Sequence, residues 1–268
     1  MHTLERKWQT LLEQLSSMEG VVVAYSGGVD STFLANAAFL SLGERVVAVT
    51  GVSPTLAARE LEEAKALASA IGIRHELVFT SEWENPAYRN NCPRRCFYCK
   101  EALFFLLAKK KDKLGLSAVV DGTNVDDLKD TRPGMEAAAR FDVGHPLLKA
   151  GFTKQDIRQK SKELGLPTWS KGSFACLASR IQKGKRLTLE AIKRVEKAED
   201  LLAALGFVQY RVRDFGNLAK IEVGEDEIGR FREEDLRRSV REHLNGLGYR
   251  FIHIDPRGYR VPGVYRLP

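Results

Sequence analysis

Four cysteines and one glycine-rich loop are the residues of this 268-residue chain whose types and spacing could do chemistry. Cys92, Cys96 and Cys99 are spaced as CxxxCxxC, and Cys176 lies much further along the chain. A CxxC pair at the junction of a loop and a helix directs two thiolates to one metal centre, and iron–sulfur clusters commonly combine such a pair with a more distant ligand. We therefore expect Cys96, Cys99 and Cys176 to be metal ligands.

The cysteine spacing alone leaves three other interpretations open. CxxxCxxC is typical of radical enzymes that bind an iron–sulfur cluster and S-adenosylmethionine, but here the triplet follows the third predicted strand instead of the first. With Cys92 as a fourth ligand, the cysteines could form a structural zinc site. Thiols without any ligand, in a reducing cell, are the third interpretation.

Positive charge surrounds the cysteine triplet. Arg89, Arg94, Arg95 and Lys100 flank it, and no acidic residue lies between Arg89 and Lys100. Nearby positive charge lowers the pKa of a thiol and so favours the thiolate, which is the form that binds metals and acts as a nucleophile. We expect the segment to attract an anionic substrate as well, with a solvated basic loop as the alternative.

The glycine-rich loop reads SGGVDST from Ser26 to Thr32, between an apolar β-branched run and a predicted helix. Two adjacent glycines, Gly27 and Gly28, let the backbone approach an anion, and the N-terminus of the helix directs N–H groups and a partial positive charge toward it. The hydroxyls of Ser26, Ser31 and Thr32 add donors. The loop therefore predicts a phosphate site, and because no lysine follows the glycines it is not of the Walker A type.

The SGGxDS pattern resembles the signature of the PP-loop ATP pyrophosphatases, which include NAD and GMP synthetases, argininosuccinate synthetase and tRNA-thiolating enzymes. The resemblance implies that ATP is cleaved between its α and β phosphates and that the loop holds the departing pyrophosphate with Mg²⁺. It also implies that AMP activates a substrate oxygen as an adenylate. Asp30 is then a catalytic residue that helps to place the metal or the phosphates.

A second element, which reads DGTNVDD, is similar to another element of the same family. By itself it would be a turn with an Asx cap. Beside the first motif, we expect it to belong to the nucleotide and metal site. The residues concerned are Asp121, Thr123, Asn124, Asp126 and Asp127.

The whole chain resembles one branch of the family, the LarE proteins, which are ATP-dependent sulfur transferases that build the nickel-pincer cofactor of lactate racemase. The matching stretches are SGGVDST, NCPRRCFYCKEALF, DGTNVDD with Arg132-Pro133-Gly134, HPLLKAGFTKQDIR, the loop around Cys176 and residues 210–213. The resemblance implies an anionic substrate, pyridinium-3,5-biscarboxylic acid mononucleotide. Each of its two carboxyls is adenylated, and sulfur then replaces AMP to give a thiocarboxylate. A homo-oligomer, with a hexamer among the assemblies considered, is also implied.

Two versions of the sulfur chemistry exist in this branch. In one, a cysteine at the position of Cys176 gives up its own sulfur and becomes dehydroalanine. In the other, a CxxC pair joins that cysteine to hold a 4Fe-4S cluster, whose free iron carries hydrosulfide to the adenylate. Because Cys96 and Cys99 are present, we favour the cluster version, although Cys92 exceeds its three-ligand pattern. The sulfur donor, sulfide or a desulfurase, stays open.

Four charged residues in the C-terminal part are expected to bind the substrate. The resemblance assigns Glu199, Arg211 and Arg213 to the substrate's phosphate and its surroundings, and Arg180, in the loop of the fourth cysteine, is added to them. Arginines at i and i+2 of a strand lie on one face, where both guanidinium groups can hold a phosphate. A pair of exposed strand arginines is the alternative. Arg230 stands where the best-known members have an acidic residue, so we assign no contact there.

Strands that alternate with helices must position these groups. Continuous apolar runs predict strands at residues 21–25, 46–51, 75–80 and 118–121, separated by helices at 31–42, 54–71 and 99–114. This alternation indicates a parallel sheet with helices on both faces, and such sheets bind ligands beyond the carboxyl ends of their strands. Both motifs of the ATP pyrophosphatases lie at such ends.

After residue 188 the pattern changes to a helix at 188–205, strands near 208–213, 219–223 and 249–254, and a charged helical stretch up to residue 247. In the segment before it, we expect one helix at 153–164, opened by a capping box of Thr153 and Asp156. The predicted fold class is therefore α/β, with a small C-terminal α+β domain. We expect a PP-loop domain over residues 1–170, an active-site loop or linker over 171–185, and a substrate or oligomerisation domain over 186–268.

Composition narrows the function classes. The chain has 42 Lys and Arg against 35 Asp and Glu, a formal charge of +7, but no basic stripe with interleaved aromatics of the kind that tracks nucleic acid. No apolar run approaches the roughly 20 residues that span a bilayer, and the N-terminal segment does not resemble a signal peptide. We therefore expect a cytoplasmic protein with no membrane or nucleic-acid partner.

Three other functions stay open. A tRNA-thiolating enzyme would need a concentrated basic surface. An ammonia-dependent synthetase of the NAD or GMP synthetase type would leave the cysteines unexplained. A non-catalytic ATP-binding or iron–sulfur carrier protein is the third.

Overall fold

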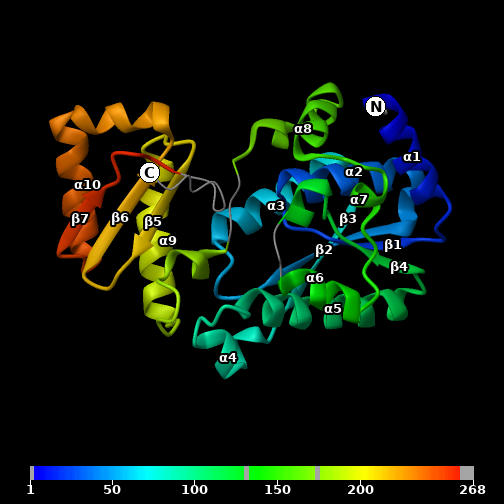
Figure 1. Cartoon of the computed structure of the whole chain (residues 1–268), viewed down its shortest axis with the longest axis horizontal. Helices are drawn as coiled ribbons and strands as arrows, with labels where there is room; N and C mark the ends of the chain where they lie inside the picture. The colour runs from blue at the N-terminus through cyan, green and yellow to red at the C-terminus, as the bar shows by residue number, and fades with distance from the viewer. Residues whose placement is uncertain (1–2, 130–132, 173–175, 260–268) are drawn as a thin grey trace. The chain divides into compact units, whose positions relative to one another are not determined.

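The computed structural model describes residues 3–129, 133–172 and 176–259 of the chain. It divides into two compact units, Met1–Phe174 and Ala175–Pro268 (Figure 1). The boundary between them falls inside segment 171–185, which was predicted to be a loop or linker.

The first unit is built on a four-stranded sheet in which all neighbours are parallel, in the order β3-β2-β1-β4. The strands are β1 (Val21–Ala24), β2 (Val46–Val52), β3 (Arg74–Phe79) and β4 (Ala118–Val120). A single parallel bridge between Val120 and Gly144 continues the sheet beyond β4. The predicted parallel sheet is confirmed.

Helices cover both faces of this sheet. The sequence of β1 is apolar throughout because both faces of this strand pack against helices. Successive side chains of a strand point to opposite faces. Val21 and Val23 accordingly join one hydrophobic core, and Val22 and Ala24 join the other. The first core takes residues from α1 (Leu4–Ser16), α2 (Val29–Leu42), α3 (Ala58–Ile71), α7 (Pro146–Lys149) and α8 (Lys154–Glu163). The second takes residues from α5 (Arg95–Leu114) and α6 (Pro133–Arg140), which lie together along the other face in Figure 1.

The second unit is a small α+β fold, as predicted. Its sheet has the order β5-β6-β7, with an antiparallel first pair and a parallel second pair. The elements are α9 (Leu189–Ala204), β5 (Tyr210–Asp214), β6 (Leu218–Val223), α10 (Glu234–Gly246) and β7 (Phe251–Ile254). A turn of 3₁₀ helix at Leu177–Arg180 precedes α9, and another at Glu225–Arg232 precedes α10.

Several local expectations differ from the structure. Helix α5 begins at Arg95 and not at Cys99, so both cysteines of the CxxC pair lie within its first five residues. Only one helix was expected between residues 144 and 185. The structure also has α7 and a 3₁₀ turn at Pro167–Ser170 in this segment. The capping box is confirmed, because the Thr153 hydroxyl accepts from the Asp156 N–H while the Thr153 N–H donates to the Asp156 carboxylate. Within the described ranges, no helix is long and apolar enough to cross a bilayer.

Candidate active site

The glycine-rich loop joins β1 to α2 and lies against α3. Gly27 has φ of +68°, in the left-handed region, and a Cβ there would stand 2.9 Å from the Cβ of Ala64. Only glycine therefore fits this position without strain. Gly28 is the N-cap of α2, so the first N–H groups of that helix point into the loop, where an anion can accept from them.

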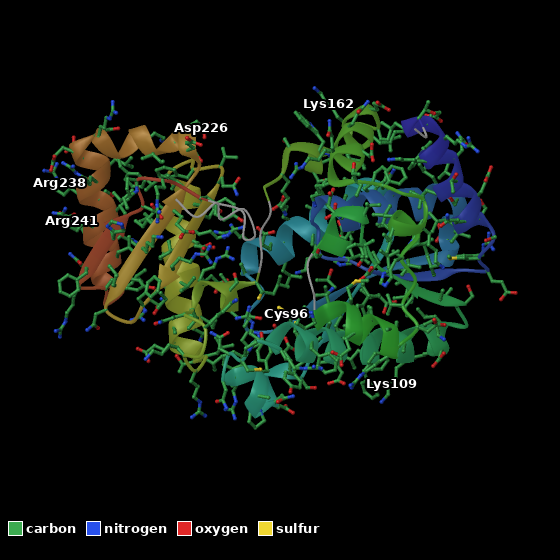
Figure 2. The ribbon with its side chains drawn as sticks, in the orientation of Figure 1. Cys96, Lys109, Lys162, Asp226, Arg238 and Arg241 are labelled. Carbon is green, nitrogen blue, oxygen red and sulfur yellow. The ribbon has the colours of Figure 1, made fainter. Side chains whose placement is uncertain are left out.

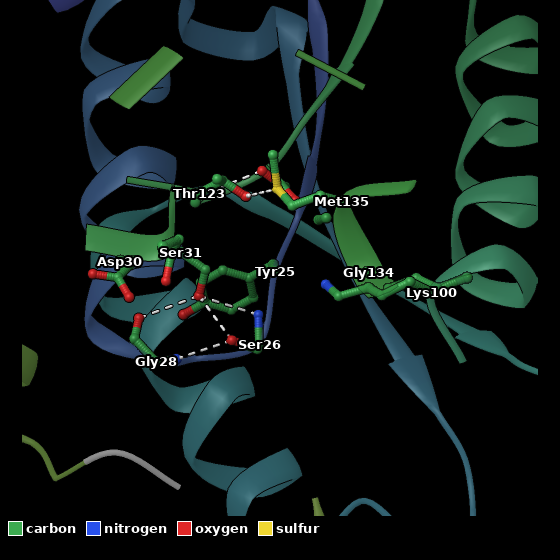
Figure 3. Close-up of a pocket in the computed structure, with 14 residues that line it drawn as sticks. Tyr25, Ser26, Gly28, Asp30, Ser31, Lys100, Thr123, Gly134 and Met135 are labelled. Atoms are coloured by element: carbon green, nitrogen blue, oxygen red, sulfur yellow. Dashed lines mark hydrogen bonds between the residues drawn. The ribbon is translucent and has the colours of Figure 1, made fainter. Parts of the chain in front are cut away.

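Hydroxyl groups give the loop its shape (Figure 3). The Ser31 Oγ accepts from the Ser26 N–H at 3.2 Å and lies 3.1 Å from the Ser26 Oγ. It also donates to the Gly28 carbonyl at 3.2 Å. Thr32 is fully buried behind the loop, so it supports the start of α2 and does not face the cavity.

Asp30 forms an ion pair with Lys154, the first residue of α8. Burial raises the pKa of the Asp30 carboxyl, although the charge of Lys154 works in the opposite direction. Oδ1 of Asp30 is buried and has no hydrogen-bond partner among the described residues. A buried carboxylate oxygen in this condition suits a divalent cation.

Asp121 lies directly after β4 and carries a second carboxylate into the same region. Its Oδ1 accepts from the Thr123 N–H at 3.1 Å and lies 2.7 Å from Nδ1 of His145. Burial acts to raise the pKa of Asp121, but the His145 hydrogen bond and the charge of Lys100 outweigh it, and the pKa is lowered. Asp121 is therefore held as a carboxylate.

The other residues of the second element divide into two roles. Asn124 is buried, and its Oδ1 accepts from the Asp126 N–H at 2.9 Å, while its own N–H donates to Asp127 at 3.0 Å. Asp126 accepts from the Lys154 N–H at 2.8 Å. These contacts shape the turn, whereas Asp127 lines the cavity.

A cavity of about 250 Å³ lies beyond the carboxyl ends of β1 and β4. Figure 3 shows Lys100 reaching toward it from α5, opposite Asp30 and Ser31. Of the predicted nucleotide-binding residues, those that line it are Ser26, Gly28, Asp30, Ser31, Asp121, Thr123 and Asp127. Gly27, Thr32, Asn124 and Asp126 do not line it.

The CxxC pair lies within the first five residues of α5. Cys96, labelled in Figure 2, is exposed, and Cys99 is half-buried three residues later on the same side of the helix. The positive end of a helix favours thiolates. The surrounding basic charge is partly neutralised, because Arg94 pairs with Glu136 at 2.8 Å. In the part of the chain that the structure describes, no three His, Cys, Asp or Glu side chains form a group that could hold a metal ion, so Cys92 does not complete a site with this pair.

Cys176 belongs to the second unit and is exposed at the start of the 3₁₀ turn that ends with Arg180. Arg180 is 2% exposed, and its guanidinium donates to Glu199 at 2.7 and 3.1 Å. It also donates to the Ser179 hydroxyl at 2.8 Å and to the Cys176 carbonyl at 3.4 Å. Glu199 is fully buried and accepts in addition from the Val212 N–H at 3.0 Å. This buried pair fixes the turn that presents Cys176.

Arg211 and Arg213 lie on β5 beside the same turn. Arg211 is 2% exposed, donates to the Tyr210 carbonyl at 2.8 Å and lies over the ring of Tyr259. Burial lowers the pKa of Arg211, and the positive charge of Arg180 adds to this effect. Arg213 donates to Glu222 at 3.0 Å and to the Ser179 carbonyl at 3.1 Å. The alternative of two exposed strand arginines is therefore wrong for Arg211.

Comparison with known proteins assigns the chain to a family. The profile of the NAD synthase family matches residues 4–91, which contain the glycine-rich loop. Pyridinium-3,5-bisthiocarboxylic acid mononucleotide synthase of Lactiplantibacillus plantarum is 34% identical over 97% of this chain and 94% of that protein. The chain belongs to the LarE family.

Two further relatives are similar to this LarE-family chain. An uncharacterized protein of Synechocystis is 41% identical over 96% of each chain. A tRNA-specific 2-thiouridylase of Heliobacterium modesticaldum is 29% identical over 57% of this chain and 50% of that protein. The LarE-family chain is a sulfurtransferase with an ATP pyrophosphatase domain, and it uses ATP.

The sequence analysis did not predict the roles of three residues at this site of the LarE-family chain. Lys154 pairs with Asp30, His145 contacts Asp121, and Gly122 leaves room for the glycine-rich loop. His145 and Lys154 both lie in the HPLLKAGFTKQDIR stretch, whose match to the family was the available signal. Nothing in that stretch indicates which carboxylates the two side chains contact.

Proposed function

We propose that the protein converts the carboxylates of pyridinium-3,5-biscarboxylic acid mononucleotide to thiocarboxylates, with ATP cleaved to AMP and pyrophosphate. The proposal rests on the presence of two features in one chain. The first is a cavity at the glycine-rich loop that is lined by carboxylates, and the second is an exposed cysteine on a turn that arginine side chains contact. The name of the Lactiplantibacillus plantarum relative, which is similar over nearly the whole chain, gives the substrate class.

In the first step, the residues of the glycine-rich loop bind the phosphates of ATP. A carboxylate oxygen of the substrate attacks the α phosphorus, an acyl adenylate forms, and pyrophosphate leaves. N–H groups at the start of α2, the hydroxyls of Ser26 and Ser31, and the Lys100 ammonium, which reaches toward the cavity, stabilise the departing charge.

Mg²⁺ fits the carboxylates at this site. A nucleotide-bound Mg²⁺ takes only one or two carboxylates, since phosphate oxygens and water complete its shell. Asp30, whose Oδ1 has no partner among the described residues, and Asp127 would hold it, while Asp121 is fixed beside them by His145. The cation supplies charge neutralisation for the phosphates.

In the second step, a sulfur nucleophile attacks the carbonyl of the acyl adenylate, a C–S bond forms, and AMP leaves. In the sacrificial version the nucleophile is the Cys176 thiolate; loss of the α proton and cleavage of the Cβ–S bond then leave dehydroalanine and the thiocarboxylate. In the cluster version, which we favour, Cys96, Cys99 and Cys176 would hold a 4Fe-4S cluster that supplies hydrosulfide. The exposed thiol of Cys96, in the first turn of a helix, suits such a ligand.

The substrate's phosphate carries negative charge into the second unit. Arg180, Arg211 and Arg213 gather around the turn of Cys176, with Glu199 and Glu222 as their carboxylate partners. The three arginines outnumber their two carboxylate partners, and this net positive charge favours binding of an anion here. We assign the phosphate to Arg211 and Arg213, with Arg180 and Glu199 positioning the turn.

The test combines ATP, Mg²⁺, the biscarboxylic mononucleotide and sulfide under anaerobic conditions. We expect AMP and pyrophosphate, and one oxygen-to-sulfur mass change for each carboxyl. Formation of ADP and phosphate would contradict the proposal. Intact-protein mass then distinguishes the two versions, because loss of sulfur from Cys176 marks sacrifice and an unchanged mass marks the cluster.

A tRNA-thiolating activity is the second candidate, because the Heliobacterium modesticaldum relative is a tRNA-specific 2-thiouridylase. The basic side chains of α10 give it little support. Figure 2 shows Arg238 and Arg241 on this helix, but Arg237 pairs with Glu234 and Arg238 with Asp235. A gel-shift titration with tRNA at two salt concentrations decides between the candidates.

That the protein forms a homo-oligomer is also a proposal, and light scattering tests it.

A further inference from the structure

His75 is a half-buried histidine of the first unit that the two reaction steps above do not use. It lies on the edge strand β3, and its Nε2 is 2.8 Å from Oγ1 of Thr50 on β2. The Thr50 hydroxyl in turn donates to the main-chain carbonyl of Tyr25 at 2.9 Å. Tyr25 follows β1 and directly precedes the glycine-rich loop. Two hydrogen bonds therefore link β3 and β2 to the point where the loop begins.

The contact with Tyr25 holds the first peptide of the loop. Strand β1 ends at Ala24, and the Tyr25 N–H donates to the Val49 carbonyl of β2 at 2.9 Å. The Tyr25 carbonyl accepts from the Thr50 side chain of the same strand. A trans peptide is planar, and its N–H points away from its C=O. The Thr50 hydroxyl therefore fixes the direction of the Ser26 N–H as well.

The Ser26 N–H begins the hydroxyl network of the loop, which Figure 3 shows. It donates to the Ser31 Oγ at 3.2 Å, and the Ser31 hydroxyl donates to the Gly28 carbonyl at 3.2 Å. The Gly28 N–H donates to the Ser26 Oγ at 3.4 Å. All three residues line the cavity. A rotation of the Tyr25–Ser26 peptide would break this network and turn donors away from a bound phosphate.

The same hydrogen bonds determine which nitrogen of His75 carries a hydrogen. A hydroxyl has one hydrogen, and that of Thr50 goes to the Tyr25 carbonyl, which can only accept. The Thr50 Oγ1 is therefore the acceptor toward His75, and Nε2 is the donor. Burial lowers the pKa of His75, and the positive charge of Lys65 adds to this effect, so the ring is neutral at neutral pH. Every donor between His75 and the Gly28 carbonyl then points the same way, and hydrogen bonds in such a chain strengthen one another.

The ring of His75 also contacts Tyr25 directly. The two ring centroids are 5.4 Å apart, with an angle of 81° between the planes. Tyr25 is 3% exposed and lines the cavity. A variant that tests the hydrogen bond must therefore keep an aromatic ring at position 75.

We propose that His75 is a positioning residue of the nucleotide site, which acts through Thr50 to hold the Tyr25–Ser26 peptide in the orientation that prepares the loop for phosphate. The inference rests on the proposed function in taking the glycine-rich loop as the phosphate site. Because His75 reaches the loop through Thr50, its effect on nucleotide binding depends on the Thr50 hydroxyl.

The test measures the affinity of the full chain for α,β-methylene-ATP with Mg²⁺ by calorimetry, and the melting temperature of each variant. Thr50→Val removes the hydroxyl at nearly the same shape. His75→Phe keeps a ring against Tyr25 and loses the donor, whereas His75→Gln supplies an amide N–H near the place of Nε2. Thr80→Val is the matched control, because the Thr80 hydroxyl also donates to a main-chain carbonyl of β2, that of Val52, at 3.3 Å and lies outside the lining of the cavity.

Thr50→Val should bind the analogue about fivefold more weakly and His75→Phe about threefold more weakly, as expected for the loss of one neutral hydrogen bond. The double variant should bind no more weakly than Thr50→Val, because the histidine acts through the hydroxyl that is already missing. His75→Gln should recover most of the affinity. Thr80→Val should lower the melting temperature and leave the affinity unchanged, which is the result expected of a merely structural contact.

The tautomer of His75 is a second readout. The chain has five histidines, and in a sample labelled with ¹⁵N-histidine the signals of His75 are identified by their loss in His75→Phe. We expect the Nε2–H tautomer in the wild type and a shifted Nε2 signal in Thr50→Val.

Three results would overturn the inference. They are wild-type affinity in Thr50→Val or His75→Phe, additive losses in the double variant, and the Nδ1–H tautomer in the wild type. If Thr50→Val does not fold, as judged by circular dichroism, His75→Phe decides, since its position is on the edge of the sheet: a loss of affinity that His75→Gln recovers supports the inference, and wild-type affinity overturns it. A wild type that does not bind the analogue contradicts the phosphate site itself, so failure of the proposed function is seen before any variant is compared.

Discussion

Replacement of Glu199 by glutamine tests whether this residue holds the second unit together or contacts the substrate. The carboxylate is fully buried, lies 2.7 and 3.1 Å from two nitrogens of Arg180, and accepts from the Val212 N–H at 3.0 Å. Breaking a buried ion pair by removing one partner costs about 3–5 kcal/mol. With a urea dependence of about 2 kcal/mol per molar, a loss of about 4 kcal/mol lowers the unfolding midpoint of this unit by about 2 M.

The positions of the tryptophans determine which unit a fluorescence assay reports on. The chain has three tryptophans, and Trp8, Trp83 and Trp169 all lie in the first unit, so fluorescence in urea follows that unit. Hydrogen exchange of peptides from α9 and β5 follows the second. We expect Glu199→Gln to lose protection in α9 and β5 while the fluorescence midpoint stays unchanged.

A paired replacement is the control. Arg180→Met combined with Glu199→Leu removes both charges at similar volume and should recover most of the lost stability, because apolar replacement of a whole buried pair is often neutral. If Glu199→Gln keeps wild-type protection but loses affinity for the mononucleotide, Glu199 contacts the substrate and the structural reasoning is refuted.

Three further predictions concern the first unit. Gly27→Ala forces a Cβ to 2.9 Å from Ala64 at a φ of +68°, so we expect about 2 kcal/mol of destabilisation and at least a tenfold loss of α,β-methylene-ATP affinity, measured by thermal melting and calorimetry; wild-type affinity would refute this. The lowered pKa of Asp121 means that its carboxylate stabilises the fold above its unfolded pKa of about 3.9, and that this stability is lost as the pH falls through the folded value. His145→Ala should therefore melt lower than the wild type at about pH 6, and the difference should shrink below about pH 4; a difference that grows in acid would contradict this assignment. Thr153→Ala removes the capping box of α8 and should cost about 1 kcal/mol in urea unfolding, whereas an unchanged midpoint would show that the cap is dispensable.

The sheet and the glycine-rich loop could be predicted because their signals are local. The apolar β-branched run of β1 is buried throughout since both of its faces meet helices. The start of α5 could not be placed, because its N-cap is Arg94 and no side chain caps it. A four-residue helix such as α7 is shorter than the window of about 11 to 18 residues over which helical periodicity can be recognised.

The site was predictable in its motifs and not in its long-range contacts. Ser26, Asp30 and Asp121 belong to sequence motifs that by themselves indicate a nucleotide site. By contrast, Lys154 contacts a residue 124 positions away, and Lys171 contacts one 144 positions away. Such pairs depend on how α8 and residues 169–171 pack in three dimensions, which no spacing along the chain encodes.

Gly122 has a consequence for how the two carboxylates of the nucleotide site are spaced. A Cβ at Gly122 would stand 3.0 Å from the main chain of both Asp30 and Ser31, so the turn after β4 lies directly on the start of α2. Asp121 and Asp30 therefore project from two backbones in contact, and no lid has to close to bring them together. The entropy of ordering this pair is lost when the chain folds and not when the nucleotide arrives. Preorganisation of this kind predicts that a larger residue at position 122 would weaken nucleotide binding by separating the two acids, even with every polar group of the site intact.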